Sequence, residues 1–451
     1  MALSRWLLGI LAGVLVALAA LWGAATVSFK APERLLHRPP DAQPDFVKTT
    51  THVSDGVSVP FSYSYAYVEF NDKGDFADEA QVARVLADLR ARVAQTDTVI
   101  LVYVHGWNHD AREGDTNVAC FDELLKATAI MQAAYTARGG KTPRGVYGVF
   151  VGWPGLIYDD VRQLATFFGR QSAADRVGER GDLLDLFNRI SRIRHETVSR
   201  TAKSPQTKFV IVSHSLGARL TYRALRPVMQ GAMSDNDSRS PFLADVAVMV
   251  NPALSADEHA SLARMVEHQT QPGTDRAQPR FVIATSESDE VLQNHFVLSQ
   301  RAAGWIRGEF MPAADPSVWP IGLYDAYLTH TLKLTGEYSR RAGRAACPTM
   351  NHEDLEIVRG KRRVKQEAEL YDYRVVRHYD ERGHETHRTT LEETGRNSRG
   401  PLMVVKVAQQ IIPNHNDIFT SPFVDFVSRV INAGLYGPRN ATDQAVVPVA
   451  K

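Results

Sequence analysis

The stretch KFVIVSHSLGARLTYRAL, residues 208–225, contains the pattern of a buried strand, a sharp turn and a helix in one run. Its first residues are apolar and mostly β-branched or aromatic, and the residues after Ser215 have the apolar spacing of a helix. On a tight strand-to-helix turn the neighbouring backbones come close together, so the residues two before and two after the serine must be small. Ser213 and Gly217 meet this requirement. The stretch therefore predicts a unit of an α/β fold that presents Ser215 at a strand end.

Two interpretations of Ser215 follow from the residues alone. A serine hydroxyl becomes a useful nucleophile when a base is placed beside it. The start of the following helix favours negative charge, so the N–H of Leu216 would point at a developing oxyanion. The alternative is a serine that caps the helix. The pattern small-x-Ser-x-Gly is common by chance, but the apolar strand before it and the long helix after it favour the nucleophile.

Strand-like and helix-like segments alternate along most of the chain. This alternation predicts a mostly parallel, doubly wound sheet flanked by helices, with the chemistry at the carboxyl ends of its strands. The strand-like runs are residues 59–70, 98–107, 145–155, 208–214, 245–253, 279–292 and 401–412, and the helix-like segments are 78–95, 119–137, 156–203, 216–231 and 421–435. The last helix is expected to have Ser421 as its cap and Pro422 in its first turn.

The domain predicted from this pattern covers residues 58–440, with a tail at 441–451. Residues 302–400 interrupt the alternation with mixed charges, several tyrosines and a plausible hairpin at 370–393. We interpret this part as an insertion, and two roles stay open for it. It either packs near the site as a cap or forms a solvated excursion from the domain.

The amino terminus contains no charged residue from Trp6 to Phe29, a run of 24 residues. A helix of roughly 20 apolar residues is long enough to cross a bilayer. We therefore expect residues 1–29 to form an uncleaved single-pass membrane anchor, with the catalytic domain on the extracytoplasmic side. A cleaved signal peptide is the alternative, because GAA at 23–25 could serve as its cut site. The proline-rich residues 30–57 are predicted to be a linker.

Composition excludes several other classes of function. The 451 residues carry a formal net charge of +1, so no overall field attracts nucleic acid, and no nucleic-acid partner is expected. Cys120 and Cys347 lack a metal-type spacing. They could pair in an oxidising compartment, but two unpaired or buried thiols are the simpler interpretation. The sequence carries no signal for an oligomeric state.

Motifs for metals and nucleotides are not visible in the sequence. It has no P-loop and no G-x-G-x-x-G after its first strand. His105 and His109 are four residues apart, but they lie on a loop and lack the H-E-x-x-H form. We therefore predict no metal and no cofactor.

The segment VSHSLGARL closely resembles the nucleophile elbow of the α/β-hydrolase superfamily. That family most often has glycine where this chain has Ser213, and the exchange keeps the residue small; His214 and Gly217 complete the motif. The order HGW, then a strand ending in W-P, then S-H-S-x-G is similar to a poorly characterised bacterial and fungal branch of serine hydrolases. The resemblance covers about residues 58–435. It implies an α/β-hydrolase fold and a catalytic Ser215.

The resemblance also implies the order serine, acid, histidine along the chain. The loop after the strand at 279–286 offers Glu287, Asp289 and Glu290. Asp289 matches the family's S-x-x-D-x-x-L acid loop, so it is the predicted acid. Its expected role is to hold the tautomer of the histidine ring and to stabilise the imidazolium.

The histidine should follow the last strand and precede the last helix. Only His415, in IIPNHNDIF, has that setting, so it is the predicted base. Asp417 is a rival acid, but it lies too close in sequence to support the ring easily. As an isolated residue, His415 would more often be structural.

The remaining feature is the segment His105-Gly106-Trp107 at the end of the strand at 98–104. By resemblance, Trp107 supplies the second N–H of an oxyanion hole, beside Leu216, and Gly106 permits the close approach of the backbone. The N–H of Asn108 is the alternative donor. A strand-end turn that carries a core tryptophan is the non-catalytic interpretation.

These features predict a serine hydrolase that cleaves carboxylic esters through an acyl-enzyme. A small-molecule or lipid ester is the expected substrate, and a lipid is suggested by the predicted anchor. Two alternatives stay open. One is a thioesterase or peptidase of the same fold, and the other is a non-catalytic, membrane-tethered binding module that keeps only the fold.

Overall fold

The architecture follows from a computed structural model. It describes residue 23 and residues 48–54, 57–138, 144–158, 161–198, 207–234, 243–269, 279–338, 347, 373–379, 385–395 and 401–436. The predicted anchor at 1–29, most of the predicted linker and the tail at 441–451 therefore lie outside the described residues. Within these ranges, eleven strands join into one sheet.

The strand order in this sheet is β1-β2-β4-β3-β5-β6-β7-β11-β8-β10-β9. From β2 to β8 along this order every neighbouring pair is parallel. The pairs β1–β2, β8–β10 and β10–β9 are antiparallel and lie at the two edges. The strands are β1 Lys48–Ser54, β2 Val57–Glu69, β3 Thr98–Val104, β4 Gly145–Gly152, β5 Lys208–His214, β6 Val246–Val250, β7 Phe281–Ser286, β8 His330–Gly336, β9 Val375–Tyr379, β10 Glu385–Glu393 and β11 Leu402–Val407.

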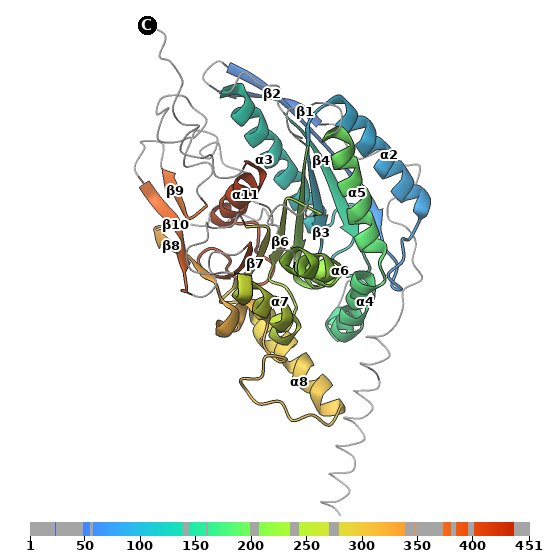
Figure 1. Ribbon diagram of the computed structural model, residues 1–451, viewed down its shortest axis with the longest axis vertical. Helices are drawn as coiled ribbons and strands as arrows, with labels where there is room; N and C mark the ends of the chain where they lie inside the picture. The colour runs from blue at the N-terminus through green and yellow to red at the C-terminus, as the bar shows by residue number, and fades with distance from the viewer. Residues whose placement is uncertain are drawn as a thin grey trace, which may run out of the picture.

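Helices cover both faces of the sheet, as Figure 1 shows. One apolar core joins the sheet to α2, α4, α5, α6 and α7, and a second core joins its other face to α3 and α11. Because helices cover both faces of the central strands, every residue of β3 is buried. The helices are α2 Glu79–Gln95, α3 Thr116–Arg138, α4 Phe167–Glu179, α5 Asp182–Val198, α6 Ser215–Ser234, α7 Ala256–Gln269, α8 Val297–Ile306 and α11 Ser421–Tyr436, with short helical turns η1 Val161–Thr166, η2 Val291–Phe296, η3 Ile321–Leu323 and η4 Asp325–Tyr327.

The mostly parallel sheet flanked by helices is confirmed, and three details of the prediction change. Strand β1 pairs with β2 inside the range that the sequence assigns to the linker. The hairpin at 370–393 forms as β9 and β10, but together with β8 it extends the sheet beyond β11. The described strands of the insertion are thus neither a cap nor a solvated excursion. Helix α11 begins at Ser421 itself, one residue earlier than the predicted cap implies.

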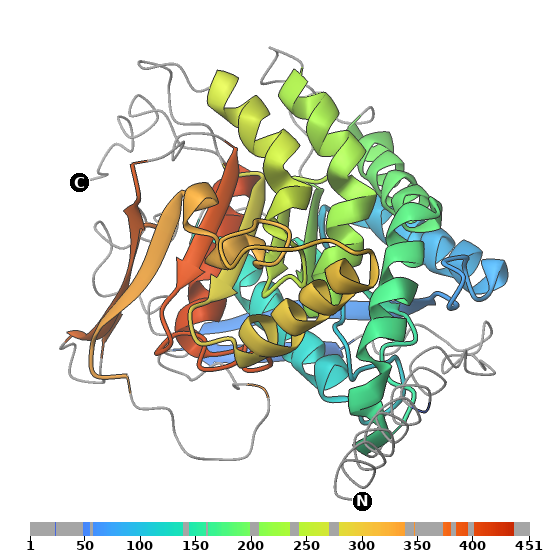
Figure 2. The same ribbon diagram turned by 90° about the horizontal axis from the view of Figure 1, so that it is seen from below.

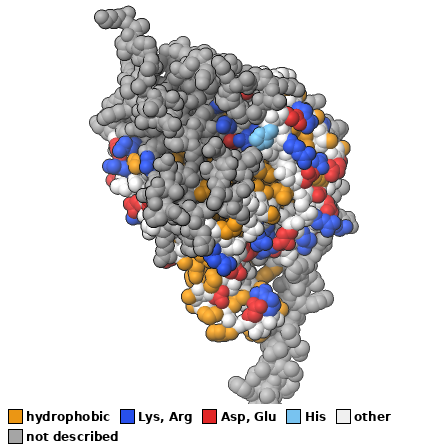
Figure 3. All heavy atoms as spheres, in the orientation of Figure 1, with side chains coloured by type: hydrophobic (Ala, Val, Ile, Leu, Met, Phe, Trp, Pro, Cys, Tyr) orange, Lys and Arg blue, Asp and Glu red, His pale blue; other side chains and the backbone are white. Residues whose placement is uncertain are grey.

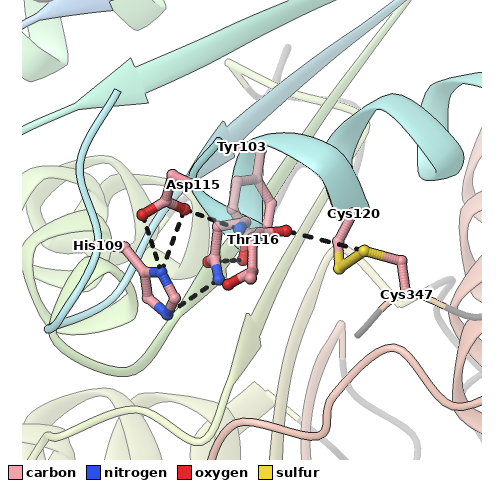
Figure 4. Close-up of a disulfide and its surroundings, with 7 residues drawn as sticks. Tyr103, His109, Asp115, Thr116, Cys120 and Cys347 are labelled. Atoms are coloured by element: carbon pink, nitrogen blue, oxygen red, sulfur yellow. Dashed lines mark hydrogen bonds and ion pairs between the residues drawn. A yellow bond between two sulfur atoms is a disulfide. The ribbon is translucent and has the colours of Figure 1, made fainter. Parts of the chain in front are cut away.

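The two cysteines form a disulfide, so the interpretation as unpaired thiols is wrong. Cys120 lies on α3, and its partner Cys347 is 227 residues away in sequence. Figure 4 shows the bridge beside the first turn of α3, where Cys347 contacts the carbonyl oxygen of Thr116. A cross-link over such a long separation restricts the unfolded chain strongly, which is its main route to stabilising the fold.

Candidate active site

Ser215 lies where β5 ends and α6 begins, on a sharp turn. Its φ of 56° is in the left-handed region, which non-glycine residues seldom occupy. A Cβ at Gly217 would collide with the carbonyl oxygens of Val104 and His105, so this position cannot hold a larger residue without rearrangement. Ser213 is fully buried between β3 and β6. The small residues on both sides of Ser215 thus have the packing reason that the sequence suggests.

The structure brings Ser215, His415 and Asp289 together from three strand ends. The Ser215 Oγ lies 2.7 Å from His415 Nε2, and His415 Nδ1 lies 2.6 Å from Asp289 Oδ2. The carboxylate can only accept, so the ring proton is on Nδ1, and Nε2 accepts from the serine hydroxyl. The second Asp289 oxygen, Oδ1, accepts the N–H of Leu292 at 2.9 Å, which fixes the carboxylate at the start of η2.

The rival acids point elsewhere. Glu287 is exposed, and its Oε1 accepts the N–H of Gln409 at 2.9 Å. Glu290 is also exposed, whereas Asp289 is buried. Asp417 lies on the same loop as His415, but its Oδ2 accepts from the side chain of Asn414 at 2.7 Å. Of these acids, Asp289 is the one in hydrogen-bond contact with the His415 ring.

Two side chains hold the backbone of the His415 loop. The carbonyl oxygen of His415 accepts from His214 Nε2 at 2.8 Å and from Asn251 Nδ2 at 2.9 Å. The Oδ1 of Asn251 accepts the N–H of Ser286 at 2.9 Å, so one amide links the ends of β6 and β7 to this loop. Asn251 has a φ of 46°, a second left-handed backbone next to the site. No sequence pattern predicts a role for Asn251, and His214 is predicted only as part of the serine motif.

The protonation state of His214 suits this contact. Burial lowers the pKa of His214 well below its usual value, and the neighbouring His415 lowers it further. The ring is therefore neutral at physiological pH, with its proton on the Nε2 that donates to the carbonyl. A neutral His214 adds no charge that would oppose protonation of His415.

Two serines, one at the end of β7 and one just after it, hold the start of the same loop. Ser286 Oγ donates to the carbonyl of Ile412 at 2.6 Å, and Ser288 Oγ donates to that of Pro413 at 2.9 Å. Both serines lie in the S-x-x-D segment that precedes Asp289. The acid loop and the histidine loop are thus fastened through side chains as well as through the triad contact.

The predicted oxyanion loop lies against the serine turn. A Cβ at Gly106 would come within 2.9 Å of both His214 Nδ1 and the Ser215 Cβ, so the absence of a side chain permits this approach. Among the described residues, the N–H of Trp107 donates to no backbone carbonyl outside the regular elements, and the N–H of Leu216 lies in the first turn of α6, where no carbonyl of the helix can accept it. The N–H of Asn108 donates to the carbonyl of Gly155 at 3.2 Å, which removes it as the alternative donor.

The side chains of this loop have structural partners. Trp107 Nε1 donates to Thr166 Oγ1 at 3.1 Å, and its ring packs edge-on against Phe167. His105 is fully buried, and its Nε2 accepts the N–H of Trp153 at 3.0 Å, while Trp153 Nε1 donates to the His105 carbonyl at 2.8 Å. His105 therefore braces the loop against the end of β4.

A further network ties the loop to α3, as Figure 4 shows. His109 Nδ1 contacts the Asp115 carboxylate at 3.2 Å, and its Nε2 lies 3.0 Å from the side-chain nitrogen of Asn117. Tyr103 donates to Asn117 Oδ1 at 2.7 Å. Burial raises the pKa of Asp115, but the contact with His109 outweighs it, so the pKa is lowered overall. Within the described ranges, no group of three or more His, Cys, Asp or Glu is arranged to hold a metal ion.

The Ser215 hydroxyl and the His415 ring are shielded from bulk water. Ser215 is 2% exposed and His415 is 6% exposed. In such a site, hydrogen bonds and charges act more strongly than in water. The arrangement can transfer a proton from an alcohol to an imidazole that a carboxylate orients, next to two backbone N–H groups.

Comparison with known proteins gives little further guidance. No protein family and no curated protein sequence matches this chain. Phospholipase PlaB from Legionella pneumophila matches over 54% of this chain and 48% of its own, at 14% identity and a TM-score of 0.24. The same phospholipase in complex with thio-NAD matches over 74% and 58%, at 12% identity and a TM-score of 0.28. An uncharacterised protein from Pseudomonas aeruginosa matches over 50% and 42%, at 11% identity and a TM-score of 0.21.

The matched part amounts to about half the length of each of these structures. TM-scores this low carry no argument about function. The geometry of the site is therefore what supports a functional assignment.

Proposed function

We propose that this protein is a serine hydrolase of the α/β-hydrolase superfamily that cleaves carboxylic esters through an acyl-enzyme. The observation that carries the proposal is the continuous chain of contacts from Ser215 Oγ to His415 Nε2 and from His415 Nδ1 to Asp289, at 2.7 and 2.6 Å. The left-handed turn at Ser215 supports it, because a helix-capping serine needs no such strain.

Acylation begins with the serine proton. His415 Nε2 takes the proton while Ser215 Oγ attacks the ester carbonyl carbon, and the carbonyl oxygen becomes an oxyanion. The imidazolium then gives the proton to the alkoxide that leaves when the carbon–oxygen ester bond breaks. Asp289 stays ionised, orients the ring and stabilises its positive charge.

Deacylation repeats the sequence with water. His415 takes a proton from a water molecule that attacks the acyl-enzyme, and then returns a proton to Ser215 Oγ as the acid departs. The N–H groups of Trp107 and Leu216 serve as the oxyanion donors in both halves. Loss of one such donor typically lowers kcat by about 10²–10³-fold.

The nucleophile narrows the reaction class. A serine argues against the aspartate-based epoxide and haloalkane branches of the superfamily. Thioesters and peptides remain alternatives to esters, because the same residues would serve all three reactions. We propose esters because they are the commonest substrates of this machinery.

The location of the domain is a separate part of the proposal. Residues 1–29 are proposed to anchor the protein in a membrane, with the domain on the extracytoplasmic side. The disulfide between Cys120 and Cys347 supports an oxidising compartment. Among the described residues, no helix has both the length and the apolar character that crossing a membrane requires.

A fluorophosphonate probe tests the chemistry. We expect the wild-type protein to be labelled and Ser215→Ala to lose labelling, with ester hydrolysis falling by about 10⁴–10⁶-fold. Ser172→Ala is the matched control, because Ser172 lies on α4 and donates only to the carbonyl of Phe168. A panel of short and long acyl esters, thioesters and amides then ranks the substrate classes.

Two outcomes contradict the proposal. Equal labelling of wild type and Ser215→Ala would assign the nucleophile to another residue. No labelling of a folded wild-type protein would favour the non-catalytic binding module instead.

A further inference from the structure

The described part of the molecule exposes its large apolar side chains mainly at one place. Leu298 is 67% exposed, Trp305 82%, Ile306 80% and Phe310 92%, and we call these four residues the apolar tip. They lie on α8 and on the turn that follows it. Figure 1 places α8 toward the lower end of the molecule, and Figure 2, which views the molecule from below, shows α8 in front near the middle. Figure 3 shows apolar side chains gathered at the same end as in Figure 1.

The apolar tip is a built feature of the fold. The N–H of Gly308 donates to the carbonyl of Trp305 at 3.0 Å, and the N–H of Glu309 donates to that of Gly304 at 2.9 Å. A Cβ at Gly304 would collide with the side chain of Met311, so Met311 folds back over the helix. The turn is thus held by its own contacts while the apolar side chains point outward.

The apolar tip also follows the site directly in the chain. Asp289 leads into η2, and η2 continues without a break into α8. Because Asp289 lies beyond the carboxyl end of β7, α8 starts on the same side of the sheet as Ser215 and His415. A surface that met the apolar tip would therefore meet the side of the protein on which the site lies.

The sequence indicates what that surface is. The uncharged run from Trp6 to Phe29 has the length of a bilayer span. Only residues 30–47 separate this run from β1, and a chain of that length reaches at most about 60 Å. Tryptophan favours the boundary between lipid and water, which suits Trp305. The arginines at 301 and 307 are exposed beside the apolar side chains, where they could face lipid headgroups.

We propose that the apolar tip inserts into the interfacial layer of the bilayer and turns the catalytic side of the domain toward the lipid. The proposal rests on the membrane anchor of the proposed function, but not on its acyl-transfer chemistry. It assigns the anchor the role of holding the domain near the bilayer and the apolar tip the role of setting its orientation.

Quenching by lipid tests the proposal on the full-length protein in phosphatidylcholine vesicles. Phe310→Cys is labelled with a nitrobenzoxadiazole dye, and the vesicles carry a fraction of doxyl-labelled lipid. We expect the doxyl lipid to reduce the dye fluorescence by about twofold or more. The control is Asp97→Cys with the same dye, because Asp97 is exposed at the opposite, amino end of β3. Its fluorescence should stay unchanged.

Each further outcome is decisive. The double change Trp305→Asp and Ile306→Asp, made in the labelled Phe310→Cys protein, should abolish the quenching at position 310. If the protein with the double change misfolds, Phe310→Cys alone still tests the proposal, because it leaves the other three residues of the apolar tip intact. Absent quenching, or equal quenching at 310 and 97, would overturn the proposal. Protection from aqueous iodide without quenching by lipid would show that protein, such as a second copy, covers the apolar tip. Flotation with the vesicles reports separately whether the anchor is inserted, and none of these measurements depends on activity.

Discussion

The polar side chains of two regions differ in burial: those at the centre of the sheet are buried, and the ion pair on the β8–β10 edge is exposed. At the centre, Ser215, Asn251 and Asp289 follow the ends of β5, β6 and β7, and all three are buried and bonded to His415. At the edge, Lys333 and Glu392 pair across β8 and β10 with 57% and 48% of their side chains exposed. Both regions are regular sheet, but only the central strands are covered on two faces.

Burial determines how strongly the fold constrains a polar residue. A buried polar group needs a partner, so each one at the centre depends on another in position and chemistry. An exposed group at the edge has water as a substitute. Changes at the centre should therefore alter catalysis by orders of magnitude, and changes at exposed positions of the edge should have almost no effect.

After the loss of the serine itself, the change expected to lower activity most is Asp289→Asn. The asparagine keeps the shape of the carboxylate, but it removes the charge and disfavours the tautomer in which His415 Nδ1 carries the proton. We expect kcat for ester hydrolysis to fall by about 10⁴-fold, with a matching loss in the rate of fluorophosphonate labelling.

Glu290→Gln is the control for Asp289→Asn, because Glu290 is one residue away and exposed. It should leave both rates within about twofold of the wild-type values, because substitutions at exposed positions usually have small effects. A fall of less than tenfold in Asp289→Asn would mean that the buried centre does not orient the base, and the contrast with the edge would disappear.

A smaller effect is expected from Asn251→Asp. The aspartate can still accept the N–H of Ser286, but it cannot donate to the carbonyl of His415 and places negative charge against it. We expect kcat to fall by about 10–100-fold through displacement of the His415 loop, with KM nearly unchanged. Steady-state kinetics on a short soluble ester separates the two constants.

Asn416→Asp is the matched change on the exposed part of the same loop. It should leave kcat as it is. If Asn251→Asp loses thermal stability but keeps the kcat of the wild type, Asn251 supports the fold alone and does not position the base.

The sequence predicts the central region well for a physical reason. Strands buried on both faces are continuous apolar runs, as in β3 and β5, and they stand out in a single sequence. The carboxyl ends of parallel strands share one side of the sheet, so Ser215, Asp289 and His415 could be expected to lie together although they are far apart in the chain. Their catalytic roles remain a proposal.

Asn251 could not be found in this way. Its side chain bonds to Ser286, 35 residues away, and to His415, 164 residues away. No local pattern encodes such contacts, and an asparagine after a strand is an ordinary turn residue. The one sequence feature that could have indicated a role for Asn251 is its position at the end of the strand next to the one that carries the predicted nucleophile.

The edges of the sheet escaped prediction for a different reason. Strand β8 is buried only at its start, and its last residues are exposed or half-buried, so it has no continuous apolar run. Strand β1, KTTTHVS, is polar and adjoins a proline-rich stretch. Such strands form because a neighbouring strand supplies hydrogen-bond partners, and this context outweighs the preference of their own residues.

The ion pair between Lys333 and Glu392 at the edge is expected to contribute little to stability. Lys333 Nζ lies 2.6 Å from Glu392 Oε2 on the face of an antiparallel pair. A double-mutant cycle with Lys333→Ala and Glu392→Ala should give a coupling free energy of about 0.2–1 kcal/mol in urea unfolding, because water solvates both charges and the side chains lose entropy when they pair. The coupling should shrink in about 1 M salt, where exposed charges are screened within about 3 Å. Ester hydrolysis should not change in any of the three variants, since neither residue contacts the site. A coupling well above this range, or a loss of activity, would show that the edge strands transmit strain to the loop after β11, and the division between a constrained centre and a tolerant edge would have to be abandoned.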